Sequence, residues 1–256
     1  MIYKFFSNIE FLFSTINDSQ LWFSKVEDFN DPFEWAFPYK IDIEKNKADI
    51  IKYVKDNSLH QPPQFIDYKI NEYLSNPKKL EDELNATVSY RRKKGVCCFT
   101  VPENNCSILM WSHYANNHKG FVLGFNENDM NLVHIKDWIN GTKISKTYIK
   151  NVNYEERLCH INPFDKDRPD IKEVEFIKSP DWENENEIRI VSPLHGLHDF
   201  NPSSLKEIIF GLNIPENIIQ KFISYIKHTE KLSQVQIKQC KKHERELKIE
   251  IKYYEF

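Results

Sequence analysis

Glycine is scarce in this sequence, with 6 among 256 residues, and no stretch is rich in it. Loops that hold phosphate groups use closely spaced glycines to bring backbone N–H groups to the ligand, so the sequence argues against a P-loop or a dinucleotide fingerprint. No apolar run approaches the roughly 20 residues of a membrane-spanning helix. Residues 1–6 lack the long apolar region and the small-residue cleavage site of a secretory signal. We therefore expect a cytoplasmic protein that is not inserted in a membrane.

Charge and cysteine content exclude further classes. The 35 Lys and Arg residues nearly balance the 38 Asp and Glu residues, which leaves a formal net charge of −3 at pH 7. This balance argues against a generally basic nucleic-acid-binding protein, although it allows a local basic patch. Five cysteines fit free buried thiols better than a disulfide framework. Since the sequence has no Cys-x2-Cys, His-Glu-x-x-His or Gly-x-Ser-x-Gly motif, we predict neither a metal site nor a serine nucleophile.

Aromatic residues are abundant, with 18 Phe and 12 Tyr, and they predict an aromatic-rich core. Short apolar strands alternate with helices, without repeats or Gly/Ser linkers. We predict a single α+β domain over residues 1–256, with a split antiparallel sheet core. Residues 43–94 are charged and mostly helical, with breaks at proline-containing sites, so we expect a helical insertion at about 43–94.

The individual elements follow from periodicity and from start and stop signals. Strands are predicted at 2–6, 21–24, 95–100, 121–125, 131–138, 145–154, 187–191, 205–210, 234–239 and 247–254. Helices are predicted from a start just after Ser7, over Phe11, to about Asp18, from Asn105 or Cys106 to Asn116, and from Glu216 to His228. Ser7 and Glu10 have the spacing of a capping box, which would begin the first of these helices.

One charged segment, residues 182–191, is the strongest candidate for chemistry. We read it as a strand in which Ile188 and Ile190 share one face, while Glu185, Glu187 and Arg189 share the other. The two carboxylates would then lie ~6.6 Å apart along the strand. Such a row is either a solvated strand face or the wall of a cleft in which a carboxylate takes part in catalysis.

Two other segments offer polar groups near predicted strands. Residues 110–120 combine Trp111, His113, Tyr114 and His118, which would serve either as an aromatic platform with a hydrogen-bond donor or as core residues with satisfied polar atoms. In the loop over residues 28–34, Asn30 and Asp31 either close an Asx-turn or position a substrate. The basic run Arg91-Arg92-Lys93-Lys94 is either a solvated helix end or a phosphate contact.

These motifs together resemble a bacterial family known only as domain of unknown function 2971. The resemblance rests on the order and spacing of Tyr3-Lys4-Phe5, residues 21–24 and 29–34, Cys98-Phe99-Thr100, residues 110–114 and 118–120, and residues 182–189. The family label itself implies no activity.

A second resemblance, at the level of fold, is to ADP-ribosyltransferase toxins that modify DNA and RNA. It rests on a strand and a helix, then the Leu-Trp-Phe-Ser strand, and later a strand with Glu-x-Glu. The resemblance implies that NAD is the co-substrate and that Glu187 stabilises the charge of its ribose, with Glu185 as a competitor for this role. The sequence departs from that superfamily because it has no Ser-Thr-Ser strand and no Arg or His on the first strand. The implied NAD-binding residues are Tyr3, Lys4, Ser24, His113, Tyr114 and Arg189, and the substrate-positioning residues are Asn30, Asp31 and His118.

The expectation from these resemblances is an NAD-dependent ADP-ribosyltransferase, acting as a toxin or defence effector on a macromolecule. RNA or DNA is the expected acceptor, and an antitoxin or inhibitory subunit is the expected partner because uncontrolled NAD consumption would harm the host cell. Two other classes stay open. One is a non-catalytic ligand-binding or sensor module. The other is a metal-dependent nuclease or hydrolase that would use Asp31, His113, His118, Glu185 and Glu187.

Overall fold

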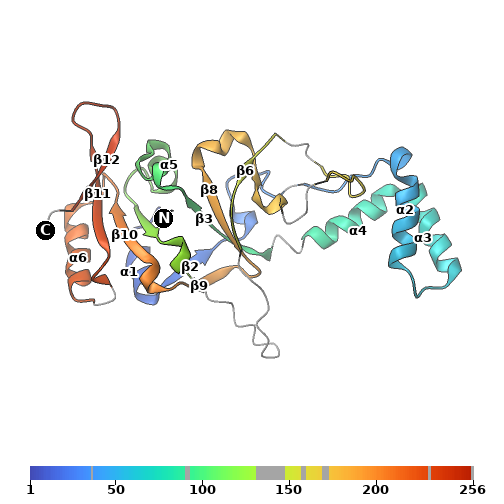
Figure 1. Ribbon diagram of the computed structural model, residues 1–256, viewed down its shortest axis with the longest axis horizontal. Coiled ribbons are helices and arrows are strands. Elements are labelled where there is room, and N and C mark those ends of the chain that lie inside the picture. The colour runs from blue at the N-terminus through green and yellow to red at the C-terminus, as the bar shows by residue number, and fades with distance from the viewer. Residues whose placement is uncertain are drawn as a thin grey trace. The chain divides into compact units, whose positions relative to one another are not determined.

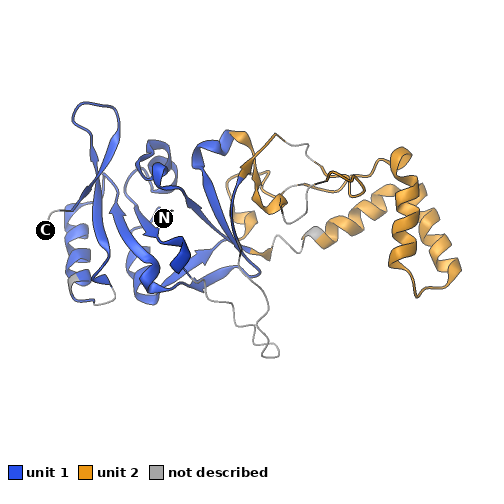
Figure 2. Ribbon diagram, viewed as in Figure 1, with its two compact units in different colours: residues 1–24, 95–152, 181–256 blue, residues 25–94, 153–180 orange. Residues whose placement is uncertain are grey.

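The computed structural model describes residues 1–35, 37–89, 93–130, 148–156, 160–168, 173–229 and 232–254. Figure 2 shows its two compact units. Unit 1 contains residues 1–24, 95–152 and 181–256, and unit 2 contains residues 25–94 and 153–180. The helical insertion expected at about 43–94 belongs to unit 2. The predicted strand at 131–138, the first three residues of the one at 145–154, and Arg91 and Arg92 lie outside the described residues.

The main element of unit 1 is a sheet in which eight strands of the described chain lie side by side (Figure 1). Neighbouring strands of this sheet run antiparallel, with one exception: β10 (Leu205–Phe210) and β11 (Gln236–Lys242) run parallel to each other. In spatial order the strands are β12 (Ile249–Tyr253), β11 (Gln236–Lys242), β10 (Leu205–Phe210), β4 (Phe121–Phe125), β1 (Ile2–Phe6), β3 (Gly95–Thr100), β8 (Glu187–Ser192) and β5 (Tyr148–Asn151). This mixed sheet with helices confirms the α+β class.

Helices pack on both faces of this sheet because alternate residues of each strand point to opposite sides. One face carries α1 (Phe11–Asp18) and α6 (Glu216–Lys227), whose apolar residues join the larger core. The other face carries α5 (Ile108–Tyr114), where Trp111 packs edge-on against Phe5. A two-stranded ribbon, β2 (Gln20–Phe23) with β9 (Gly196–Asp199), completes the regular strands of unit 1. The sequence predicted β2 but not β9.

The start of α1 differs from the prediction. The helix begins at Phe11, and Glu10 before it already has helical dihedral angles and makes no capping bond with its side chain. Instead, Asn8 Oδ1 accepts a hydrogen bond from the Glu10 backbone N–H at 2.9 Å. The Ser7–Glu10 capping box is therefore wrong, because the helix starts too late for Glu10 to occupy the third helical position.

Unit 2 is built on three helices, as the charged and proline-interrupted segment predicted. These are α2 (Ile43–Asn57), α3 (Pro63–Ser75) and α4 (Pro77–Ser89). They enclose a small core centred on Ile50, Val54, Tyr73 and Leu80. Two short strands, β6 (Asn153–Tyr154) and β7 (Ile177–Lys178), pair in parallel in the same unit.

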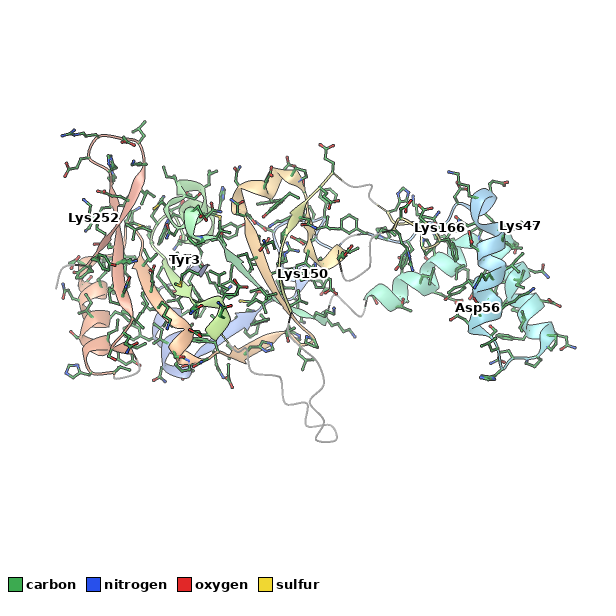
Figure 3. All side chains as sticks on the ribbon, viewed as in Figure 1. Tyr3, Lys47, Asp56, Lys150, Lys166 and Lys252 are labelled. Atoms are coloured by element: carbon green, nitrogen blue, oxygen red, sulfur yellow. The ribbon has the colours of Figure 1, made fainter. Side chains whose placement is uncertain are left out.

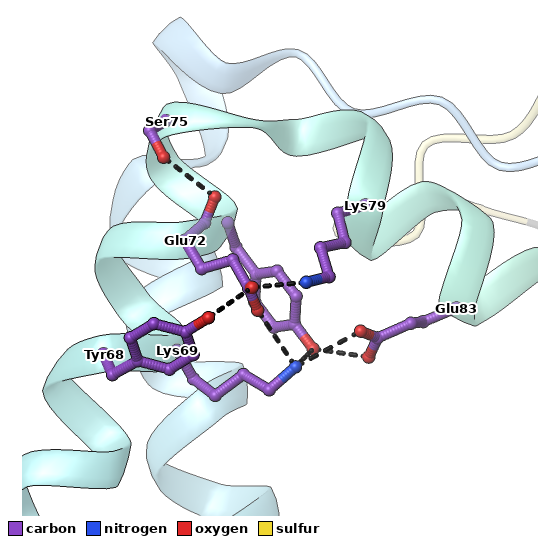
Figure 4. Close-up of polar contacts among 7 residues, drawn as sticks. Tyr68, Lys69, Glu72, Ser75, Lys79 and Glu83 are labelled. Carbon is purple, nitrogen blue, oxygen red and sulfur yellow. Dashed lines mark hydrogen bonds and ion pairs between the residues drawn. The ribbon is translucent and has the colours of Figure 1, made fainter.

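Polar contacts tie α3 to α4 (Figure 4). Lys69 forms ion pairs with Glu72 at 3.1 Å and with Glu83 at 3.3 Å, and Lys79 also contacts Glu72. The two lysines hold the pKa of Glu72 down at about 2, against the opposing effect of its burial. In the part of the chain that the structure describes, no helix is long and apolar enough to cross a membrane.

Candidate functional site

Five residues stand in register across five neighbouring strands of the sheet. Direct pairing joins Glu207 of β10 to Gly124 of β4, Gly124 to Tyr3 of β1, Tyr3 to Thr100 of β3, and Thr100 to Glu187 of β8. Because directly paired residues project from the same side of a sheet, this row lies on one face, which is the face that α5 covers. Residues that are up to 204 positions apart are thus brought into one line.

Gly124 makes room for Tyr3 in this row. A Cβ atom at this position would lie 2.7 Å from Tyr3 Cε1, so the ring fits only over a glycine. The Tyr3 hydroxyl then donates to Glu207 Oε2 at 3.1 Å, and Lys238 of β11 donates to Glu207 Oε1 at 2.8 Å. Burial and the nearby Glu207 carboxylate raise the pKa of Tyr3 to about 12, so the phenol keeps its proton. Tyr3 is labelled among the side chains of the sheet in Figure 3.

Glu187 and Arg189 form a buried ion pair on β8. Arg189 Nε donates to Glu187 Oε1 at 2.6 Å, and Nη2 donates to Oε2 at 3.1 Å. Only 4% of Glu187 and 0% of Arg189 are exposed, so the solvated-face alternative is wrong. As predicted, Ile188 and Ile190 point the other way, into the larger core. Burial and the Glu187 carboxylate raise the pKa of the neighbouring Cys98 thiol well above its usual value.

Glu185 does not continue this strand. It ends a 3-10 helix, η6 (Pro180–Glu185), and Asn186 then adopts a left-handed conformation with φ of 44° before β8 begins. The prediction that Glu185 and Glu187 share one strand face is therefore wrong, because the turn at Asn186 breaks the two-residue period. Glu185 is nevertheless buried, at 8% exposure, and its carboxylate accepts a hydrogen bond from the Tyr114 hydroxyl of α5.

The turn that carries Glu185 is fixed by two polar side chains. Thr100 donates from Oγ1 to the Glu185 carbonyl at 2.5 Å. Asn104, within η3 (Pro102–Cys106), donates to Thr100 Oγ1 at 2.9 Å and to the Glu185 carbonyl at 2.7 Å. Sequence reasoning missed Asn104 and Glu207 as parts of the site, and it named Thr100 only for its motif. Their local patterns carry no signal, because each acquires its role from strands and loops distant in the sequence.

Residues 110–190 match a known family model. The family is described as a protein of unknown function, DUF2971. The match confirms, over this segment, the first resemblance drawn from the sequence. Searches of curated proteins and of solved structures found no match.

The DUF2971 segment contains Tyr114, Glu185, Glu187 and Arg189 of the candidate site. Tyr3, Lys4 and Ser24 lie before it in the chain. Tyr3 and Lys4 occupy neighbouring positions of β1 and so face opposite sides of the sheet, and only Tyr3 shares the face of Glu187. Lys4 lies over the Phe6 and Phe99 rings at 5.6 and 5.8 Å.

Ser24 is held through its backbone. Its N–H and carbonyl form an isolated bridge with Val96, with hydrogen bonds of 3.0 and 2.8 Å. This bridge ties the end of β2 to β3. The structure therefore gives the Ser24 backbone a role in joining the ribbon to the main sheet.

His113 lies in the last turn of α5, and His118 follows shortly after the helix ends. His113 is exposed, and its ring centroid lies 6.4 Å from that of Tyr114. His118 stacks on buried Trp111, and its Nε2 lies 3.3 Å from Ser112 Oγ. Its Nδ1 atom is buried without a hydrogen-bond partner among the described residues, and burial lowers the pKa of this imidazole.

Asn30 and Asp31 lie in unit 2. Asp31 is buried and its Oδ1 accepts a hydrogen bond from the Phe33 N–H at 2.9 Å, which is the Asx-turn that the sequence predicted. Asn30 is exposed. Among the described residues of both units, no three His, Cys, Asp or Glu side chains gather in a way that could hold a metal ion.

Proposed function

We propose that this protein transfers ADP-ribose from NAD to a macromolecule. The observation that carries the proposal is the row Tyr3–Thr100–Glu187, in which a phenol, a hydroxyl and a fixed carboxylate follow one another on neighbouring strands of one face of the sheet. Cleavage of the nicotinamide–ribose bond creates positive charge at the ribose C1′ atom. A carboxylate that is already positioned in a buried site stabilises such charge without reorganisation.

Glu187 has the first of two roles in this proposal. Arg189 holds both of its oxygens and favours its ionised form, so the carboxylate is negative and immobile before substrate binds. As the C1′–N1 bond breaks, its electron pair leaves with nicotinamide, and Glu187 faces the positive ribose that remains.

Glu185 has the second role, as the base towards the acceptor. Tyr114 holds its carboxylate, and Thr100 and Asn104 hold its backbone. The base takes the proton of the acceptor nucleophile, which forms the new bond to C1′.

Release of nicotinamide from NAD by the purified full chain tests the proposal. We expect Glu187→Gln to lower the rate per folded molecule about 100-fold or more, in the range for loss of one preorganised electrostatic group. The rate is compared per folded molecule because this change also leaves Arg189 buried without its carboxylate and lowers stability. Glu185→Gln should lower transfer to an acceptor more than it lowers NAD hydrolysis. Glu127→Gln, at an exposed glutamate of unit 1, is the matched control and should change neither rate. Full activity of Glu187→Gln would contradict the assignment.

RNA or DNA is the acceptor that we propose, with an antitoxin or inhibitory subunit as partner. The support is the resemblance to nucleic-acid-modifying toxins, together with the basic run that ends in Lys93 and Lys94. Lys94 is already paired with Glu175, which leaves exposed Lys93 as the described member available to a phosphate. Labelled NAD incubated with cell lysate decides the acceptor: label removed by nuclease supports this choice, and label removed only by protease contradicts it.

A non-catalytic binding module is the second candidate, and the Glu187–Arg189 pair favours it. Both oxygens of Glu187 already accept hydrogen bonds from Arg189, as in a pair that only stabilises a fold. This candidate predicts that NAD stays intact in the presence of the wild-type chain, at every acceptor tested. The metal-dependent hydrolase gains no support from the described side chains.

A further inference from the structure

Unit 1 has a hollow of about 840 Å³ beside the end of α5, bordered by the turn between β1 and α1 and by the segment that leads into α6. This volume falls within the range of small-molecule sites in proteins. The residues that line it do not include Glu185, Glu187 or Arg189, so it is distinct from the carboxylate pair. Its chemistry can therefore be considered independently of the proposed transferase activity.

The charge of the hollow favours an anion. Lys119 and His113 line it, and none of its described lining residues is Asp or Glu. The side chain of Lys119 is in no ion pair or hydrogen bond with the described part of the chain. An uncompensated ammonium and an exposed imidazole are groups that bind phosphate oxygens.

Two carboxamides add hydrogen-bonding groups of both kinds. Asn116 and Asn117 have φ angles of 48° and 53°, and His118 follows at 67°, so three consecutive residues other than glycine hold the left-handed conformation. Such a run is unfavourable for L-residues and least so for asparagine. No hydrogen bond within the described chain occupies the two Asn side chains, which line the hollow with a donor and an acceptor each.

Apolar side chains form another part of the lining. Ile9 comes from the turn before α1, and Pro215 and Ile218 come from the start of α6. A flat ring gains free energy by covering such a surface, and its edge can then hydrogen-bond to carboxamides. Positive charge, paired donors and acceptors, and an apolar surface together match a phosphate, a ribose and a base.

We propose that this hollow binds a ribonucleoside monophosphate. Lys119 and His113 hold the phosphate, Asn116 and Asn117 hydrogen-bond to the sugar and to the base edge, and the base covers the apolar side. His113 connects this hollow to the candidate site, because its ring lies 6.4 Å from that of Tyr114, whose hydroxyl donates to Glu185. The nucleotide site goes beyond the transferase proposal and stands without it.

Calorimetric titration of the full chain with AMP, GMP, CMP and UMP tests the proposal, with the matching nucleosides as probes without phosphate. We expect at least one monophosphate to bind about tenfold or more tightly than its nucleoside. Lys119→Gln should lower the affinity for that monophosphate about tenfold, to the level of the nucleoside, and Lys119→Arg should restore it. Lys242→Gln, at an exposed lysine of β11 that does not line the hollow, is the matched control.

Asn117→Gly separates binding from folding. Glycine accepts the left-handed conformation without strain, so the melting temperature should not fall, whereas loss of the carboxamide should lower the affinity for the monophosphate severalfold. The proposal is overturned if no monophosphate binds at millimolar concentration, or if Lys119→Gln binds as the wild-type chain does. Because this titration involves no NAD turnover, its failure leaves the transferase result unaffected, and the reverse also holds.

Discussion

Two ionic clusters in this chain differ in their access to water. The Glu187–Arg189 pair lies on β8, whose six residues are all buried, and it has bidentate geometry. The cluster of Lys69, Glu72 and Glu83 on α3 and α4 has side-chain exposures of 22%, 12% and 48%, so water reaches it. Charges screened by water contribute little, whereas a buried charge that loses its partner is costly. The same kind of contact therefore plays a different energetic part in each unit.

The largest effect should come from breaking the buried pair. We expect Arg189→Met to lower the free energy of unfolding of unit 1 by about 3–5 kcal/mol, because Glu187 is left buried without its cation. Lys79→Met, which removes a cation from the partly exposed cluster, should lower the free energy of unfolding of unit 2 by about 1 kcal/mol or less. The two losses of stability are measured by denaturant unfolding followed by hydrogen exchange, on β8 for Arg189→Met and on α4 for Lys79→Met. The double variant Glu187→Met with Arg189→Met should recover much of the stability that Arg189→Met loses. Equal losses of stability in Arg189→Met and Lys79→Met would contradict the comparison.

The next largest effect concerns the apolar core of unit 2. We expect this core to stabilise the unit more than its ion pairs do. Leu80 is fully buried in the small core of this unit. We expect Leu80→Ala to lower the free energy of unfolding of unit 2 by about 2–4 kcal/mol, through lost burial and the cavity that remains. Hydrogen exchange of α2, α3 and α4 should accelerate while β4 and β10 stay protected. A smaller effect than that of Lys79→Met would show that the ionic cluster, and not the apolar core, stabilises unit 2.

The smallest effect is a difference in pH dependence between the units. In unit 1, burial lowers the pKa of His118 and of His198, so the unfolded chain takes up these protons first and stability falls as the pH drops below about 6.5. In unit 2, the pKa of Glu72 is lowered to about 2, so its contribution persists above pH 4.5 and disappears as the pH falls towards 2. Between pH 7.5 and 5.5, the melting temperature should therefore fall for unit 1 alone. Replacing both histidines with Gln should flatten that dependence, and an equal fall in unit 2 would contradict it.

Local patterns in the sequence predicted much of the fold. The strands at 2–6, 95–100, 121–125 and 205–210 were predicted with the ends that the structure gives them. Their apolar runs are short and bounded by clear turn residues, so little competes with the strand conformation. By contrast, β9 carries Gly196 and alternating exposure in a segment without strand-like composition, and it exists because β2 pairs with it. Pairing of this kind has no local signature.

The candidate site divides in the same way. Sequence reasoning identified Glu185, Glu187, Arg189 and Tyr114, because charged and aromatic residues beside apolar positions are visible in a short window. It misplaced Glu185 on the strand, since nothing in the local pattern reveals the left-handed turn at Asn186. It offered Tyr3 and Lys4 as equals, and the register of β1 with β3 and β8 separated them.

The sequence by itself determined the alternation of β8, in which Ile188 and Ile190 oppose Glu187 and Arg189, because the two-residue period of a strand is a property of its own backbone. Only the tertiary structure decided that the charged face is buried and that Glu187 stands in register with Thr100 and Tyr3. Strand order and burial depend on contacts between segments far apart in the chain. The free energy of those contacts is shared by all the strands of the sheet, so no single segment of sequence encodes it.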